Sequence, residues 1–207
     1  MSRHQSGRGP ISTLVVCTAN ICRSPTAGFA LSQFPFLSVQ SAGIRASSGE
    51  GICSSAAVRI RDFPGGADYV DSFVSRPINF FNVSDFELIL TATSSIRGAL
   101  VQKYPEIRDR TFTLIESKLL AASRLEDQET SILTHDGPSS VLSHRRGTLP
   151  TPAPRKRWFG GTDAPPMDLA DTHGIQRPRR HTGTVSKALD VGNQLGTSLG
   201  HWNLLHD

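Results

Sequence analysis

The stretch that decides the fold reads Leu14-Val15-Val16-Cys17-Thr18-Ala19-Asn20-Ile21-Cys22-Arg23-Ser24-Pro25. Its apolar, β-branched start predicts a buried strand, and its proline suits the first turn of a helix. A short loop that joins a strand to a helix N-terminus gathers backbone N–H groups, whose dipoles attract an anion. The stretch therefore predicts a strand, an anion-binding loop and a helix, in that order.

Two side chains in this loop point to phosphate chemistry. The field of the backbone amides favours the thiolate form of Cys17, which is the nucleophilic form of a cysteine. Arg23 presents a planar fork of donors that can hold two oxygens of one anion. These groups suit the cleavage of a phosphate monoester through a phospho-cysteine intermediate. The simpler alternative is a buried cysteine on a core strand followed by an ordinary helix cap, but it explains neither Arg23 nor its spacing.

These residues resemble the signature loop of the low-molecular-weight protein tyrosine phosphatases, C-x5-R-S with asparagine at the third loop position. Further similarity lies at Ser41-Ala42-Gly43 and in the segments 86–93 and 110–114, so that the resemblance covers roughly residues 11–120 and 165–200. It implies hydrolysis of protein phosphotyrosine or a small aryl phosphate, with Cys17 and Arg23 as catalytic residues and no cofactor. The loop residues that the resemblance assigns to substrate binding are Thr18, Ala19, Asn20, Ile21, Cys22, Arg23 and Ser24.

The same chemistry needs a carboxylic acid that protonates the leaving group and then accepts a proton from water. Asp171-Thr172-His173 resembles the Asp-Pro-aromatic loop of the family, with threonine in place of proline and histidine in place of the aromatic residue. Asp171 is therefore the predicted general acid, and His173 is predicted to contact the substrate. Asp168 and Asp163 remain alternatives, and all three can also be helix caps or solvated loop charges.

The hydrophobic pattern predicts an α/β fold with a doubly wound, four-stranded parallel sheet, helices on both faces and the phosphate-binding loop after the first strand. Residues 1–10 are predicted to be a flexible arm, and residues 11–207 a single domain. Loops are expected over 62–84, and a polar, exposed or partly disordered insertion over 127–162. A terminal helix from Val185 is expected to be weakened by Gly192 and Gly196. The strands are expected at 11–16, 36–42, 86–92 and 111–114, and the other helices at 26–33, 52–60, 93–104 and 115–125.

Composition narrows the functional classes. The chain has 207 residues, a formal net charge of +4 and three cysteines, which fit a catalytic thiol in a reducing compartment better than a disulfide framework. We expect a cytoplasmic protein that binds neither a membrane nor a nucleic acid, because no apolar run is long enough to span a bilayer and the basic clusters lack interleaved aromatics. The basic clusters at 145–146, 155–157 and 177–181 are expected in solvated loops. No metal site is expected, since the seven histidines are scattered through loops and the C-terminal third.

The remaining cysteines leave alternatives open. The resemblance implies that Cys22 forms a reversible disulfide with an oxidised Cys17, although a neutral Cys22 in a tight loop can equally be inert. Cys53 is expected to pack as a small apolar residue. A thiol-dependent arsenate reductase on the same fold would need Cys22 and Cys53 as resolving thiols. A protein that binds phosphate or phosphoproteins without turnover is the non-enzymatic alternative.

Overall fold

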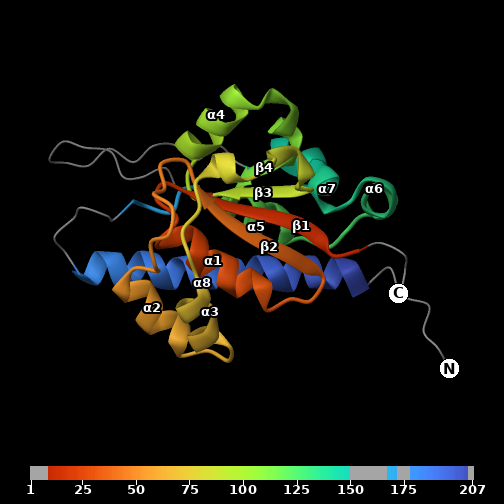
Figure 1. The fold of residues 1–207 in the computed structure, drawn as a ribbon. Coiled ribbons are helices and arrows are strands. Elements are labelled where there is room, and N and C mark those ends of the chain that lie inside the picture. Colours follow the sequence, from red (N-terminus) through yellow and green to blue (C-terminus); the bar gives the residue numbers. More distant parts are fainter. Residues whose placement is uncertain (1–8, 150–166, 172–177, 205–207) are drawn as a thin grey trace, which may run out of the picture.

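The computed structural model describes residues 9–149, 167–171 and 178–204. A parallel sheet of four strands, in the order β2-β1-β3-β4, forms its centre (Figure 1). The strands are β1 (Ile11–Cys17), β2 (Leu37–Gly43), β3 (Leu88–Thr91) and β4 (Thr111–Thr113). This confirms the predicted doubly wound α/β class, and β1 and β3 are the central pair, as their continuous apolar runs suggest.

The helices cover both faces of this sheet. Helix α1 (Arg23–Ser32) leads from β1 to β2, and α4 (Ser94–Lys103) leads from β3 to β4. Because β2 and β4 lie on opposite sides of the central pair and such crossovers are right-handed, these two helices lie on opposite faces. Helix α8 (Pro178–Leu204) packs against α1 and α5 (Leu114–Ala121) (Figure 1). The remaining helices are α2 (Ser54–Arg61), α3 (Gly66–Ser72), α6 (Asp127–Asp136) and α7 (Pro138–His144).

The topology places the loop after β1 at the ligand-binding edge of the sheet. From the central pair, one crossover runs from β1 outward to β2 and the other from β3 outward to β4. The divergence opens a crevice beyond the carboxyl ends of the central strands, where α/β sheets bind their ligands. Cys17 is the last residue of β1, so the fold and the loop motif point to the same place.

Helix α8 begins at Pro178, well before the predicted start at Val185, and its glycines serve a purpose that the sequence analysis missed. A methyl group at Gly192 would lie 2.8 Å from the Cβ of Ala30, and one at Gly196 would lie 2.2 Å from the ring of Phe34. Gly192 therefore lets α8 approach α1 closely, and Gly196 leaves room for Phe34 in the turn after α1. Helix propensity predicted a weakened helix. In the folded protein, the lack of a side chain at these glycines instead allows close packing.

The segment 127–149 corrects the expectation of an exposed or partly disordered insertion. It forms α6, α7 and a 3₁₀ turn at Arg145–Gly147. Leu133, Val141 and Leu142 are buried in the main core. Each helix has only two or three turns, too few for a clear hydrophobic period to emerge from a Ser- and Thr-rich sequence. Residues 150–162 of the predicted insertion lie outside the described residues.

The segment 62–84 is also more regular than predicted. It contains α3 and two 3₁₀ turns, at Ile78–Phe80 and Val83–Asp85. The hydroxyl of Tyr69 in α3 donates a hydrogen bond of 3.0 Å to the carbonyl oxygen of Pro25. A helix of two turns fixed by such long-range contacts leaves little periodic signal in the sequence.

The arginines at 145 and 146 do not lie in a solvated loop. Arg145 is buried, and the Arg146 guanidinium lies 4.2 Å from the ring centroid of Phe112. Residues 1–8 of the predicted arm and the cluster at 155–157 lie outside the described residues. Within the described ranges, no helix has the length and apolar character needed to cross a membrane.

Candidate active site

The loop between β1 and α1 surrounds the sulfur of Cys17 with hydrogen-bond donors. The backbone N–H of Asn20 donates to Cys17 Sγ at 3.2 Å, and the Ser24 hydroxyl donates to the same sulfur at 3.0 Å. Helix α1 begins at Arg23, earlier than the predicted start at residue 26, so its N-terminus lies at the loop itself. Hydrogen-bond donors and a helix N-terminus therefore converge on this one sulfur.

Asn20 holds the loop in shape. It has a φ of 55°, and it is the only non-glycine residue with positive φ among those described. Its side-chain amide donates at 2.9 Å to the hydroxyls of both Ser24 and Ser41, and its carbonyl oxygen accepts the backbone N–H of Arg76 at 2.8 Å. Asparagine tolerates this left-handed conformation better than most residues, and here three hydrogen bonds stabilise it. Ala19, the residue before it, does not have a positive φ.

Gly43 at the end of β2 gives the loop the space that it needs. A Cβ at this position would lie 2.7 Å from the carbonyl oxygen of Thr18 and 2.8 Å from the backbone nitrogen of Asn20. The Ser41-Ala42-Gly43 segment, which resembles the family in sequence, therefore has a physical role. Gly43 lets β2 approach the loop, and the Ser41 hydroxyl accepts a hydrogen bond from the Asn20 side chain.

Arg23 points into the same pocket and connects it to Asp171. The Arg23 residue is 3% exposed, and one of its terminal nitrogens donates to Asp171 Oδ2 at 2.6 Å and to Thr18 Oγ1 at 3.0 Å. The other donates to the carbonyl oxygen of Leu169 at 3.3 Å. The Asp171 side chain is 45% exposed, so this ion pair lies at the pocket mouth. An incoming anion that binds this terminal nitrogen must exchange with the carboxylate.

Asp168, one of the two alternatives to Asp171 as general acid, has a different position and different partners. Asp168 is buried, and its carboxylate accepts hydrogen bonds from the Ser94 backbone N–H at 2.7 Å and from the Ser94 hydroxyl at 3.2 Å. Since Ser94 is the first residue of α4, Asp168 satisfies a free N–H group at the start of this helix, beside the N-cap residue Thr93. Asp163, Thr172 and His173 lie outside the described residues, so His173 stays a prediction.

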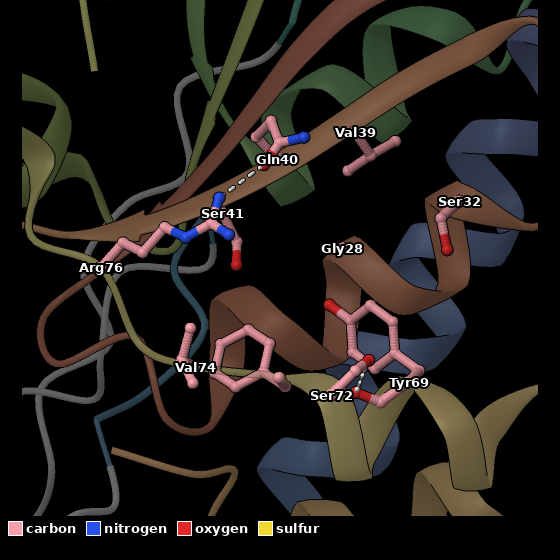
Figure 2. Close-up of a pocket in the computed structure, with 10 residues that line it drawn as sticks. Gly28, Ser32, Val39, Gln40, Ser41, Tyr69, Ser72, Val74 and Arg76 are labelled. Carbon is pink, nitrogen blue, oxygen red and sulfur yellow. Dashed lines mark hydrogen bonds between the residues drawn. The ribbon is translucent and has the colours of Figure 1, made fainter. Parts of the chain in front are cut away.

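The pocket itself is small. It has a volume of about 60 Å³, which suits a small anion, and it is lined by Cys17, Thr18, Ala19, Ile21, Cys22, Arg23 and Asp171. A larger cavity of about 170 Å³ lies between β2, α1 and α3 (Figure 2). Its lining includes Gln40, Tyr69 and Arg76 but neither a cysteine nor a carboxylate. The chemistry therefore belongs to the smaller pocket, and the larger one borders the residues that support Asn20.

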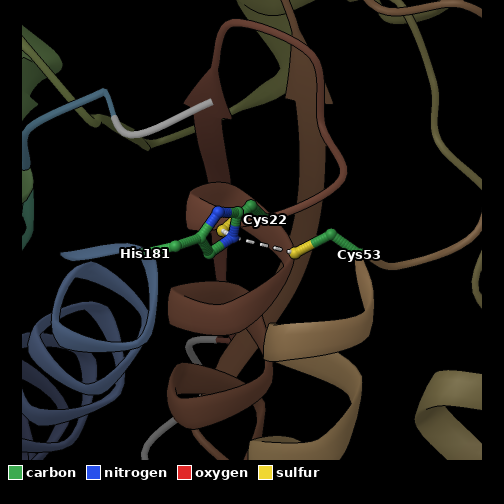
Figure 3. A group of neighbouring side chains, drawn as sticks. All are labelled: Cys22, Cys53 and His181. Atoms are coloured by element: carbon green, nitrogen blue, oxygen red, sulfur yellow. Dashed lines mark hydrogen bonds between the residues drawn. The ribbon is translucent and has the colours of Figure 1, made fainter. Parts of the chain in front are cut away.

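A second group of reactive side chains was not anticipated. His181 Nε2, in the first turn of α8, lies 3.2 Å from Cys22 Sγ and 3.3 Å from Cys53 Sγ (Figure 3). A hydrogen bond from the Cys22 thiol to the Cys53 sulfur lowers the pKa of Cys53 to about 5 and raises that of Cys22 far above its ordinary value, with burial adding to the latter. Cys53 packs against the apolar cluster that contains Ala56 and Ile60, as predicted, and in addition its sulfur contacts His181. Sequence spacing carried no signal for this group, because three separate elements contribute.

The fold and the pocket together define an α/β phosphatase of the cysteine-dependent kind. A family model for low molecular weight phosphotyrosine protein phosphatase matches residues 12–127. The chain belongs to this family and is a hydrolase of phosphate groups. The matched region ends inside α6, so Asp171 and α8 lie beyond it.

Curated relatives carry two kinds of name. The chain is 32% identical over 107 residues to a protein-arginine-phosphatase from Geobacillus stearothermophilus, a match that covers 51% of the chain and 70% of that protein. It is 36% identical over 100 residues to the low molecular weight protein-tyrosine-phosphatase Wzb of Salmonella typhi, covering 47% of the chain and 64% of that protein.

Among solved structures, the YwlE arginine phosphatase from Geobacillus stearothermophilus superposes with a TM-score of 0.62 at 20% identity, covering 96% of the chain and 98% of that structure. Vibrio vulnificus Wzb in complex with benzylphosphonate gives a TM-score of 0.55 at 20% identity, covering 95% and 99%. At such identities the likeness supports the fold alone.

Proposed function

We propose that this phosphatase hydrolyses protein phosphotyrosine through a phospho-cysteine intermediate, with Cys17 as nucleophile, Arg23 as phosphate ligand and Asp171 as general acid and base. One observation carries the proposal. The Cys17 sulfur receives two hydrogen bonds at the floor of a pocket that also contains Arg23 and Asp171. This arrangement supports the roles that we assign to the three residues.

The first step forms a sulfur–phosphorus bond and breaks the ester bond. The Cys17 thiolate attacks phosphorus while Arg23 and the loop amides hold the phosphoryl oxygens, and the departing phenolate takes a proton from Asp171. Before this step the phosphate replaces Asp171 on the Arg23 nitrogen to which it is now bonded at 2.6 Å. The exchange frees the carboxyl group to meet the leaving oxygen.

The second step restores the enzyme. Asp171, now a carboxylate, accepts a proton from a water molecule, and the oxygen of that water attacks phosphorus. The sulfur–phosphorus bond breaks, inorganic phosphate leaves and the Cys17 thiolate is regenerated. The hydrogen bonds from Asn20 and Ser24 stabilise the thiolate as a leaving group in this step.

For the substrate, the apolar side chains of Ala19 and Ile21 at the pocket support an aromatic ester. His173 is proposed to contact the same ring. Phosphoarginine is a second candidate substrate, because a relative that matches over 70% of its own length is named a protein-arginine-phosphatase. A phosphotyrosyl peptide and a phosphoarginyl peptide of the same sequence distinguish the two. We expect a higher kcat/KM for phosphotyrosine, and a preference for phosphoarginine would reverse this assignment.

The residue roles are tested by turnover of p-nitrophenyl phosphate between pH 5 and pH 8 with a chelator present. We expect no turnover by Cys17→Ser and a loss of about 10²–10⁴-fold in kcat for Asp171→Asn, with a flattened pH profile. Asp168→Asn is the matched control, and we expect it to lower stability while kcat changes little. Full activity of Cys17→Ser would refute the mechanism, and a larger loss in Asp168→Asn than in Asp171→Asn would reassign the acid.

The alternatives have their own readouts. An arsenate reductase would form arsenite from arsenate at the expense of a thiol such as dithiothreitol, and we expect none. A binding protein without turnover would retain vanadate or phosphate and hydrolyse nothing. We also propose a cytoplasmic location, because the three cysteines are free and the proposed nucleophile must stay reduced.

A further inference from the structure

We propose that Cys22, Cys53 and His181 form a binding site for a thiophilic divalent cation, zinc in the first place. Their three ligand atoms all lie within 4.8 Å of one another (Figure 3). In a tetrahedral zinc site with ordinary Zn–S and Zn–N distances, neighbouring ligand atoms lie about 3.6–3.8 Å apart. The observed separations of 3.2 and 3.3 Å between Nε2 and each sulfur are within a small side-chain adjustment of that geometry.

The backbone already holds two of the ligands in place. The carbonyl oxygen of Cys22 accepts hydrogen bonds from the Thr26 backbone N–H at 3.1 Å and the Thr26 hydroxyl at 2.6 Å. The backbone N–H of Cys53 donates to the carbonyl oxygen of Ile21 at 2.7 Å, which ties the start of α2 to the loop. A bound ion would gain from this preorganisation, because little chain order is lost on binding.

The donor set selects the class of ion. Thiolates and imidazole suit zinc and other soft or borderline ions, whereas magnesium and calcium prefer oxygen ligands. Binding releases the thiol proton or protons that Cys22 and Cys53 hold and involves no change of oxidation state. Three protein ligands leave one coordination position open, and Cys53 and His181 are only partly buried, so water can take it.

The site would connect three elements that the sequence separates widely. Cys22 precedes α1, Cys53 precedes α2, and His181 lies in the first turn of α8. Cys22 also lines the phosphate pocket. A bound ion would therefore fasten the phosphate-binding loop to the start of α8, in addition to the apolar contacts there.

The experiment uses the metal-free full chain with Cys17→Ser, so that the proposed nucleophile cannot act as a ligand and binding is read independently of turnover. Cobalt(II) is added first, because its thiolate charge-transfer and tetrahedral d–d absorption report the ligands directly. We expect one cobalt per chain, thiolate bands in its spectrum, displacement by zinc and a higher Tm with zinc bound.

Removing one ligand at a time tests the assignment in the same background. Cys53→Ser and His181→Ala should each weaken binding by more than about 100-fold, since even the loss of a group behind a ligand costs 10–100-fold. His201→Ala, an exposed histidine of the same helix, is the matched control and should bind as before. Circular dichroism without metal checks that each variant is folded.

Two outcomes would overturn the proposal. One is unchanged cobalt affinity and spectrum in folded Cys53→Ser and His181→Ala. The other is binding that occurs in the wild type and disappears with Cys17→Ser, which would place the ion on the nucleophile. Neither outcome bears on phosphatase activity, so this proposal and the proposed function fail separately.

Discussion

Two buried arginines, one in the phosphate-binding loop and one in the segment 127–149, show how similar burial can serve different ends. Arg23 is 3% exposed and Arg145 is 7% exposed. The carboxylate that pairs with Arg145 belongs to Glu129, which is itself 5% exposed, whereas the side chain of Asp171 beside Arg23 is 45% exposed. Arg145 also donates to the carbonyl oxygens of Leu120, Ser123 and Arg124.

The exposure of the paired carboxylate, rather than the burial of the arginine itself, distinguishes a structural arginine from one that can bind a ligand. The Glu129 carboxylate that pairs with Arg145 is itself buried, so removing the pair would leave a buried charged group without its hydrogen bonds. Asp171 can turn to solvent when an anion takes its place. Burial then strengthens the interaction of Arg23 with the anion that it binds, because the local dielectric constant is low.

The largest expected effect is on turnover at Arg23. Arg23→Ala should lower kcat/KM for p-nitrophenyl phosphate by roughly 10³–10⁵-fold, the range for a transition-state arginine in phosphoryl transfer. Urea unfolding of the same variant should show a smaller effect on stability than Arg145→Leu. A variant that loses its fold instead of its kcat/KM would erase the distinction between the two arginines.

At Arg145 we expect the opposite result, a loss of stability with little change in turnover. Arg145→Leu should destabilise the protein by roughly 3–5 kcal/mol, because it leaves Glu129 charged and unpaired in the interior. At a temperature where the variant is still folded, kcat/KM per folded molecule should stay near that of the wild type. Arg124→Leu, an exposed arginine nearby, is the control and should change the free energy of unfolding by less than about 0.5 kcal/mol.

A smaller effect is expected in helix α8, where two glycines differ in their surroundings. Gly196→Ala should cost roughly 1–3 kcal/mol, since the new methyl group would overlap the ring of Phe34. Gly183→Ala in the same helix has nothing within 4 Å and should be neutral or stabilising. Chemical denaturation of the two variants measures this, and equal effects would mean that α8 does not need its glycines for packing.

The smallest effect is a pH dependence of stability at Glu129. The hydrogen-bonded Arg145 holds the pKa of this carboxyl below its ordinary 4.5. A carboxyl whose pKa is lower in the folded state stabilises the fold above its unfolded pKa, and this stabilisation is lost as the pH falls through the folded value. The difference in unfolding free energy between wild type and Glu129→Gln should therefore shrink below about pH 4.5.

Glu106→Gln, at an exposed carboxyl, is the control for that titration. The two denaturation series are measured at matched ionic strength, from pH 7 down to the acid limit of the fold. A difference for Glu129→Gln that stays constant over the whole range would contradict the role assigned to the buried pair.

The sequence alone led to the sheet, the loop and its cysteine and arginine, because these depend on neighbouring residues. The twelve residues from Leu14 to Pro25 contain a β-branched run, a fixed cysteine–arginine spacing and a proline. These features indicate the strand, the loop and the helix, respectively. The parallel sheet then followed from the alternation of strands and helices along the chain.

Contacts between distant parts of the chain were decided only by the tertiary structure. Asp168 binds the first N–H group of α4, the segment 127–149 forms packed helices, and Cys53 and His181 lie beside Cys22. None of these has a local pattern, since each depends on where a later element packs. Short-range periodicity determines which element forms, whereas the pairing of distant side chains depends on the packing of the whole chain.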